Sequence, residues 1–298
     1  MPIPTRKINQ ITSTKTTETP DYFDRLGQEY YVNFYDLFEP PFQVTGTDPR
    51  FVYLTEQYKK VISICLQVVR DQMELAMVLG TVGTGKSSIC SIIRSRLAAR
   101  NDYRVAYLDD LTATPSQLMV NILLEFGQDP TSRQVEALKC QFKGLLTQKA
   151  VTPLVILVDE AQTTTKYNLE LLRQLLDLET NNGKLVQIIL FGQEDLARKV
   201  AARPNFLNRV VSQVKLERLG GEETLKLIRH RLSVAGAEYE LFSPQALQAM
   251  VSYSKGIPGE VCKLGYHTLL LGSRRNERII SAATVTEARI LVQGEIEA

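Results

Sequence analysis

Short apolar runs alternate with amphipathic stretches through the middle of the chain. Apolar runs of this length indicate strands that are buried on both faces of a sheet, and amphipathic stretches of helical period indicate helices packed on it. Strands that alternate with helices pair in parallel, so the pattern predicts an α/β fold with a parallel five-stranded sheet. The predicted strands are residues 75–79, 104–108, 154–158, 186–191 and 210–216.

The amphipathic stretches change their arrangement at residue 219. Residues 55–219 carry the alternating pattern of a nucleotide-binding α/β domain, whereas 220–298 are all-helical and predict a separate small lid domain. The helices of the first part are expected at 55–70, 86–99, 115–126, 132–148 and 167–179. Those of the second part are expected at 222–235, 243–254, 258–272 and 283–293, after a hinge at Gly220-Gly221.

Two segments precede these domains. Residues 1–20 are Thr-rich and basic without apolar periodicity, which predicts an arm that is disordered in isolation, or one that orders on a partner or on DNA. Residues 21–54 hold ten of the chain's 22 aromatic residues. Such a segment is expected to pack across the core near the adenine, the alternative being a platform for stacked bases.

Composition narrows the class of protein. The net charge of the 298 residues is only +2, so any nucleic-acid contact must come from a local patch. The four cysteines form no metal-binding or disulfide spacing. No run reaches the ~18 apolar residues of a membrane span, and the start lacks the apolar region of a signal peptide. These features predict a cytoplasmic protein with no membrane partner.

A phosphate-binding P-loop follows the first predicted strand. The sequence from Gly80 to Ser87 fits G-x-x-x-x-G-K-[ST] and stands between a strand and a helix, as the motif requires. Glycines allow several backbone N–H groups to turn toward one anion, and the helix start adds its positive end. The alternative is a chance glycine-rich turn. The residues predicted to bind ATP are Gly80, Thr81, Val82, Gly83, Thr84, Gly85, Lys86, Ser87 and Ser88.

Further groups predict the chemistry of ATP hydrolysis. Lys86 is expected to reach the β- and γ-phosphates, and Ser87 to hold Mg²⁺. Asp159 and Glu160 end the apolar strand 154–158, as in a Walker B site, where Asp159 would hold Mg²⁺ and Glu160 would polarise the attacking water. Gln193 follows the next strand and is expected to contact the γ-phosphate as sensor 1. The alternative for Asp159 and Glu160 is an acidic helix start after a strand. The alternative for Gln193 is a simple turn amide.

The whole arrangement resembles the AAA+ ATPases, and within them the ExeA/GspA type. The resemblance covers about residues 34–290. Besides the P-loop, it rests on the stretches 38–42, 48–54, 158–162, 191–196, 228–232 and 241–247. The phenylalanine–proline stretch 38–42 and the Gly-Gln-Glu-Asp-Leu stretch 192–196 are more specific than the P-loop, which many ATPases share.

The resemblance implies a homo-oligomer, as a ring or a helical filament, with ATP and Mg²⁺ between subunits. In that family an arginine of the neighbouring subunit reaches the γ-phosphate; Arg209 is the first candidate and Arg203 the second, and a surface arginine is the alternative for each. The family's lid also carries an arginine after Gly-Ile-Pro. Here Gly259 stands at that position, so Lys263 would have to replace the arginine, and slow hydrolysis is expected.

Two functions fit this resemblance. The first is a DNA-transposition regulator of the TnsC/TniB/MuB type, which oligomerises on duplex DNA and connects a target-selection protein to the transposase, with ATP hydrolysis controlling disassembly. The alternative is a secretion or envelope-assembly ATPase like ExeA. Because ExeA continues into a transmembrane segment and a periplasmic domain that this sequence does not contain, the first is preferred.

Contacts to duplex DNA are expected mainly at phosphates. The alternative for each candidate is a solvated basic face, and Asp109-Asp110 argues against a tight grip nearby. The candidate DNA-binding residues are Thr112, Thr114, Ser132, Arg133, Lys139 and Lys143. Arg274, Arg275 and Arg278 form a further small patch that could meet DNA or a transposase.

Overall fold

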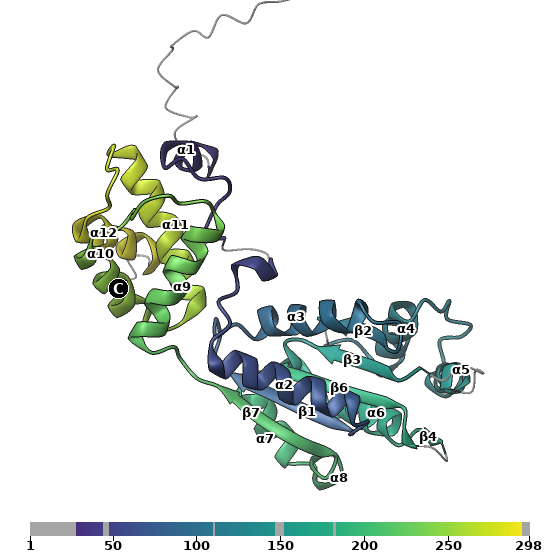
Figure 1. Ribbon diagram of the computed structural model, residues 1–298. Helices are drawn as coiled ribbons and strands as arrows, with labels where there is room; N and C mark the ends of the chain where they lie inside the picture. The colour runs from purple at the N-terminus through teal and green to yellow at the C-terminus, as the bar shows by residue number, and fades with distance from the viewer. Residues whose placement is uncertain (1–27, 44–47, 110, 147–151, 181–182, 294–298) are drawn as a thin grey trace, which may run out of the picture.

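The computed structural model describes residues 28–43, 48–109, 111–146, 152–180 and 183–293. The predicted arm 1–20 and Asp110 lie outside these ranges. The described chain forms an α/β domain and a helical domain, which lie side by side (Figure 1).

A five-stranded parallel sheet forms the centre of the α/β domain, in the order β2-β3-β6-β1-β7. The predicted fold class is therefore confirmed. Its strands are β1 (Leu75–Gly80), β2 (Arg104–Leu108), β3 (Leu154–Val158), β6 (Val186–Gly192) and β7 (Val210–Leu216). The order makes β3, β6 and β1 immediate neighbours, so their carboxyl ends meet at one edge of the sheet.

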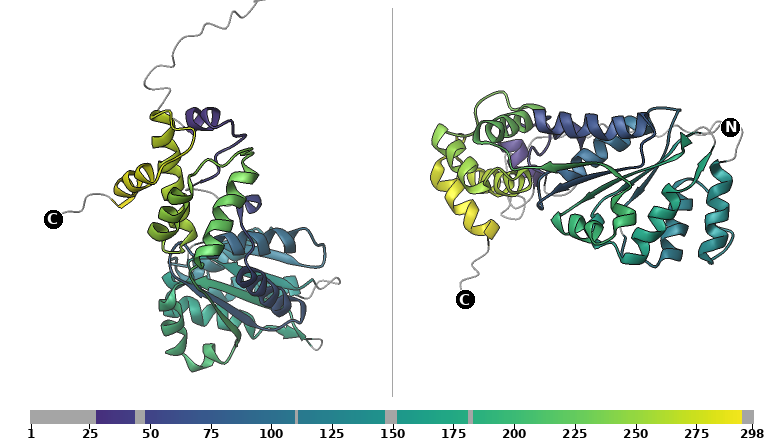
Figure 2. Two further views of the ribbon diagram at one scale, coloured as in Figure 1. Left: turned by 60° about the vertical axis from the view of Figure 1, so that its left-hand side comes forward. Right: turned by 90° about the horizontal axis from the view of Figure 1, so that it is seen from below.

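Helices cover both faces of the sheet (Figure 2). Successive strand residues point to opposite faces, so one cluster contains Met77, Ile156 and Ile188, and the other contains Val78, Leu157 and Ile189. The first face is covered by α4 (Pro115–Glu125), α5 (Val135–Leu146), α6 (Lys166–Leu176), α7 (Glu194–Ala201) and α8 (Pro204–Leu207). The second is covered by α2 (Glu56–Arg70) and α3 (Lys86–Ala98).

Several short elements were not predicted. They are α1 (Gln28–Phe34), α7, α8, the 3-10 turns η2 (Pro49–Phe51) and η3 (Ala161–Thr163), and the two-residue strands β4 (Glu179–Thr180) and β5 (Gly183–Lys184). Apolar periodicity cannot reveal elements this short, because they span one or two turns and are placed by contacts with the rest of the protein.

The helical domain contains α9 (Gly221–Val234), α10 (Pro244–Ser254), α11 (Pro258–Arg274) and α12 (Ala282–Gln293), which share one apolar core. Leu219 already belongs to that core, and its N–H donates to the carbonyl of Gly256 at 2.8 Å. The connection to the sheet therefore runs through residues 217–218, just before the predicted hinge. None of the helices in the described ranges is long and apolar enough to cross a membrane.

The aromatic segment lies elsewhere than expected. Tyr31, Tyr35 and Phe42 are fully buried in the core of the helical domain, and α1 packs on α11. Phe42 is seated over Gly265: a Cβ at that glycine would lie 2.6 Å from the Phe42 ring. The aromatic residues Tyr31, Tyr35 and Phe42 therefore cover the helical domain, because glycines on α11 leave room there for aromatic rings, whereas Val52 and Leu54 of the same segment pack on the α/β core.

Candidate nucleotide site

The residues predicted to bind and hydrolyse ATP within one subunit meet at the carboxyl edge of the sheet. The P-loop follows β1, Asp159 and Glu160 follow β3, and Gln193 follows β6. Since these three strands are neighbours, their ends place all three segments together, at the edge where open α/β sheets bind ligands.

The P-loop backbone has the shape of an anion-binding turn. Gly83 and Gly85 have φ values of 79° and 88°, in the left-handed region that side chains disfavour. Tyr58 of α2 supports the loop from below, because its buried hydroxyl donates to the Thr84 carbonyl at 2.7 Å. The Thr84 hydroxyl in turn donates to the carbonyl of Thr81 at 2.8 Å.

Lys86 lies under this loop and is 4% exposed. Its ammonium group donates to the carbonyls of Gly80, at 3.0 Å, and Thr81, at 2.9 Å. Burial lowers the pKa of Lys86, and the negative charges of Glu160 and Asp159 oppose this shift. The lysine is thus held between backbone carbonyls and the two carboxylates, where a phosphate oxygen can become a further acceptor.

Ser87 and Asp159 offer oxygen ligands that fit Mg²⁺. The Ser87 side chain is exposed, and Asp159 is 4% exposed with one carboxylate oxygen accepting the N–H of Glu160 at 2.9 Å. The described residues contain no cluster of three His, Cys, Asp or Glu side chains that could hold a metal.

Glu160 is exposed and has an unusual backbone, with a φ of 47°. Its carboxylate accepts a hydrogen bond from the side-chain amide of Gln162, whose oxygen accepts the backbone N–H of Gln193 at 3.1 Å. The predicted base and the predicted sensor segment are therefore joined through Gln162. The sequence motif includes this glutamine, but sequence reasoning assigned it no role.

The helical domain touches the P-loop directly. The N–H of Gly259, at the start of α11, donates to the Gly83 carbonyl at 3.0 Å. A Cβ at Gly259 would lie 3.1 Å from the Gly83 Cα, so the glycine at the family's arginine position allows this approach. Lys263 lies one turn further on, and its ammonium pairs with Glu260 at 2.9 Å.

Both candidate arginines lie at the opposite edge of the sheet. Arg209 immediately precedes β7, with ion pairs to Glu74 at 2.6 Å and Asp177 at 2.5 Å. Arg203 precedes α8, which lies at the end of the sheet remote from the helical domain (Figure 1), and one of its nitrogens donates to the Lys199 carbonyl at 2.9 Å. From this edge either arginine could serve only the nucleotide of a neighbouring subunit.

The candidate DNA-binding residues divide into two groups. The Ser116 hydroxyl bonds to the Arg133 carbonyl, so the loop with Thr112 and Thr114 lies beside the loop with Ser132 and Arg133. Lys139 instead faces α6, because its ammonium contacts Glu136 and Gln174, each at 2.8 Å. The exposed Lys143 lies one turn further along α5.

The C-terminal arginine patch is largely engaged within the chain. Arg278 pairs with Asp36 at 3.0 Å and stacks over the Phe34 ring, so it holds the aromatic segment on the helical domain. Arg275 pairs with Glu287, whereas Arg274 is exposed.

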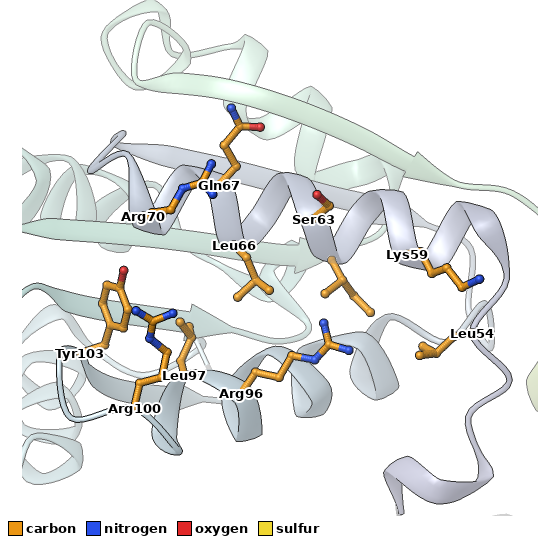
Figure 3. Close-up of a pocket in the computed structure, with 11 residues that line it drawn as sticks. Leu54, Lys59, Ser63, Leu66, Gln67, Arg70, Arg96, Leu97, Arg100 and Tyr103 are labelled. Carbon is orange, nitrogen blue, oxygen red and sulfur yellow. The ribbon is translucent and has the colours of Figure 1, made fainter.

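A groove of about 490 Å³ between α2 and α3 is separate from the P-loop (Figure 3). Its floor is apolar and includes Leu54, Leu66 and Leu97, and four cations line it. Three of the cations pair with a nearby acid: Lys59 with Glu56, Arg70 with Asp71, and Arg100 with Asp102. The rim therefore attracts anions less than its lysine and arginines suggest.

Comparisons with known proteins agree with this site. Residues 69–200 match the family model described as an AAA domain. General secretion pathway protein A of Aeromonas hydrophila is 29% identical over 273 residues, which make up 89% of this chain and 49% of that protein. The chain therefore spans about half the length of the curated relative it matches.

Solved structures share the fold at low sequence identity. The ORC2 protein of Aeropyrum pernix, in ADPNP–ADP complexes, has a TM-score of 0.69 at 15% identity, over 88% of this chain and 73% of that one. The Drosophila ORC bound to DNA has a TM-score of 0.68 at 14% identity, over 96% of this chain and 71% of that one. Residues 69–200 thus match an AAA domain, and the chain shares the P-loop fold of these solved structures.

Proposed function

We propose that this chain is an ATP-hydrolysing switch that assembles with copies of itself in a secretion or envelope-assembly machinery. The observation that supports the switch is the contact between the P-loop and the helical domain, from the N–H of Gly259 to the carbonyl of Gly83. A nucleotide held by this loop acts on both domains at once. Loss of its γ-phosphate would therefore change how they are arranged, and with it the fit between subunits.

The proposed hydrolysis uses the residues at the carboxyl edge. Lys86 would bind the β- and γ-phosphates, and Glu160 would orient the attacking water. Mg²⁺ on Ser87 and Asp159 would neutralise phosphate charge. Gln193 would contact the γ-phosphate. Gly259 stands where the family's lid usually has an arginine, so the bidentate contact of a guanidinium group with the phosphates is missing. We therefore expect slow ATP turnover.

The proposed role in secretion rests on the similarity to the Aeromonas hydrophila protein. Its similarity extends over 89% of this chain, and it is named a general secretion pathway protein. That name supports the secretion interpretation rather than the transposition regulator, for which the comparisons provide no partner protein. A cytoplasmic location remains a prediction.

Arg203 is the better candidate for a residue that acts on the neighbour's nucleotide. Its single described hydrogen bond is to a backbone carbonyl, whereas Arg209 would have to leave two carboxylates. If Arg209 moved to a neighbouring subunit, both carboxylates would lose an ion-pair partner, and this loss is unfavourable in free energy. We therefore reverse the order expected from the sequence.

A second candidate function is an ATPase that assembles on duplex DNA. It is favoured by the adjacency of two polar loops, one with Thr114 and one with Ser132 and Arg133, which the bond from the Ser116 hydroxyl to the Arg133 carbonyl joins. A transposase and a target-selection protein would be its partners.

Electron microscopy combined with an ATPase assay tests both functions. Purified protein would be imaged with ADP or a non-hydrolysable ATP analogue, with and without duplex DNA, and turnover would be followed against protein concentration. Rings that need the ATP analogue but not DNA, with turnover rising on assembly, support the switch. Filaments that form only with DNA would favour the second candidate, and turnover independent of concentration would contradict a shared site.

A further inference from the structure

Gln162 lies between two segments that the proposed reaction brings together. Its backbone belongs to the 3-10 turn η3, which follows Glu160. Its side-chain amide donates to the Glu160 carboxylate, and its amide oxygen accepts the backbone N–H of Gln193 at 3.1 Å. One side chain therefore connects the ends of β3 and β6.

The chemistry of the partners determines the orientation of this amide. A backbone N–H can only donate, so the oxygen of the Gln162 amide must face Gln193. The NH₂ group is then directed at Glu160, whose ionised carboxylate can only accept. Both hydrogen bonds are made with this one orientation, and rotating the amide by half a turn would break both.

Gln162 is itself held in position. The Lys199 ammonium donates to the Gln162 carbonyl and, at 2.9 Å, to the Thr164 carbonyl. A Cβ at Gly192 would lie 3.2 Å from the amide oxygen of Gln162, so the glycine at the end of β6 leaves room for the amide.

The backbone at Glu160 depends on this neighbourhood. A left-handed φ in a residue with a side chain costs of order 1 kcal/mol and persists where surrounding contacts impose it. Here the Glu160 N–H donates to the Asp159 carboxylate, and its carbonyl accepts the Thr163 N–H at 3.0 Å. The main chain is thus fixed by η3, while the carboxylate is fixed by the Gln162 amide.

We propose that Gln162 is a positioning residue that holds the Glu160 carboxylate in place for ATP hydrolysis and couples it to the end of β6. This role rests on the proposed ATPase function. A shift of residues 192–193 on contact with a γ-phosphate would pass through the amide to Glu160.

Two substitutions separate this role from a structural one. Gln162→Met keeps the length and removes both hydrogen bonds; kcat should fall by between about tenfold and a hundredfold, with KM nearly unchanged, because the base is misplaced and not the nucleotide. Gln162→Glu can still accept from Gln193 but places a like charge at Glu160. Its kcat should also fall with KM nearly unchanged, because the like charge repels the Glu160 carboxylate from its place.

Thr163→Ala is the matched control, because its hydroxyl donates to the Glu160 carbonyl at 2.9 Å and not to the carboxylate. It should keep the wild-type kcat. Hydrogen–deuterium exchange provides a readout without turnover: the amide of Gln193 should exchange faster in Gln162→Met and not in Thr163→Ala. Unchanged exchange, or an active wild type whose kcat survives both substitutions at Gln162, would overturn the proposal alone. A wild type that hydrolyses no ATP in any assembly state would overturn the proposed function and this role with it.

Discussion

The candidate nucleotide site and the amino edge of the central sheet handle charge in opposite ways. At the carboxyl edge, Lys86 is held by backbone carbonyls and Glu160 by a neutral amide. At the amino edge, Glu74 bridges Lys184 and Arg209, and Asp177 bridges Arg209 and Arg173. Charges that neutralise one another are costly to separate, whereas bonds to neutral groups can be exchanged for those of a ligand. The difference indicates which edge binds and which edge stabilises.

Backbone conformation is also unusual at the candidate nucleotide site. Gly83, Gly85 and Glu160 all have positive φ at the carboxyl edge. Strain of this kind is maintained by surrounding contacts and is typical of functional sites. The carboxyl edge is also where the helical domain makes its contact, through Gly259.

The largest effect is expected at Lys86. Lys86→Ala should reduce ATP affinity at least a hundredfold and abolish ATP-dependent assembly, because it removes the buried cation under the loop. Isothermal titration with ATP measures this. Lys59→Ala, which removes an exposed lysine of α2, is the control and should bind normally. Assembly of Lys86→Ala with ATP would place the site elsewhere.

Glu160 should affect hydrolysis without affecting binding. Glu160→Gln should slow turnover by about 10²–10⁴-fold and prolong the assembled state, because the amide cannot accept the proton of water. Steady-state ATPase rates and titration with ATP check the two halves of this expectation. Glu194→Gln, at an exposed carboxylate of the same edge, should keep the wild-type rate. Normal turnover in Glu160→Gln would remove this residue from the mechanism.

Arg203 should act across subunits. Arg203→Ala should lower turnover by about 10³-fold with normal nucleotide binding, since the residue would stabilise charge on the neighbour's phosphate. Mixing it with Lys86→Ala should restore partial activity, because mixed interfaces combine an intact P-loop with an intact arginine. Arg198→Ala, on an exposed arginine of α7, is the control. A mixture as inactive as its components would contradict action in trans.

Arg209 should matter for stability instead. Arg209→Ala leaves Glu74 and Asp177 without a shared partner and should lower the free energy of unfolding by about 1–3 kcal/mol, as measured in urea. The Arg203→Ala variant should unfold like the wild type. An Arg209→Ala protein of normal stability that loses turnover would return Arg209 to the role expected from the sequence.

The smallest effect is expected at Lys263. Exposed ion pairs such as the one with Glu260 contribute about 0–1 kcal/mol, so Lys263→Ala should change ATP affinity by less than about threefold. Titration with ATP measures it, with Lys226→Ala, which removes a similar exposed pair on α9, as the control. A tenfold loss in Lys263→Ala alone would show that this lysine replaces the family's arginine.

The sheet could be predicted, and the P-loop and the acidic pair after β3 could be proposed as a nucleotide site, because their determinants are local. A strand buried on both faces must be apolar throughout, as in Leu154–Val158, and a loop that wraps an anion needs glycines at particular positions, as at Gly83 and Gly85. The spacing of Gly80 to Ser87 and the acidic pair after β3 carry this information in consecutive residues.

Other features depend on which distant residues meet, and only the tertiary structure decided them. The sequence determined that Phe42 must be buried, but the glycine at 265 that receives it lies more than 200 positions away. The sequence placed Gln162 in a motif, but the role proposed for its amide depends on the hydrogen bond from Gln193, which follows the neighbouring strand β6. It offered Arg209 as the first candidate and Arg203 as the second, and the carboxylates around Arg209 are the reason why we propose the reverse order. Hydrophobic period and backbone freedom are properties of a segment, whereas a hydrogen bond or an ion pair belongs to two segments that folding brings together.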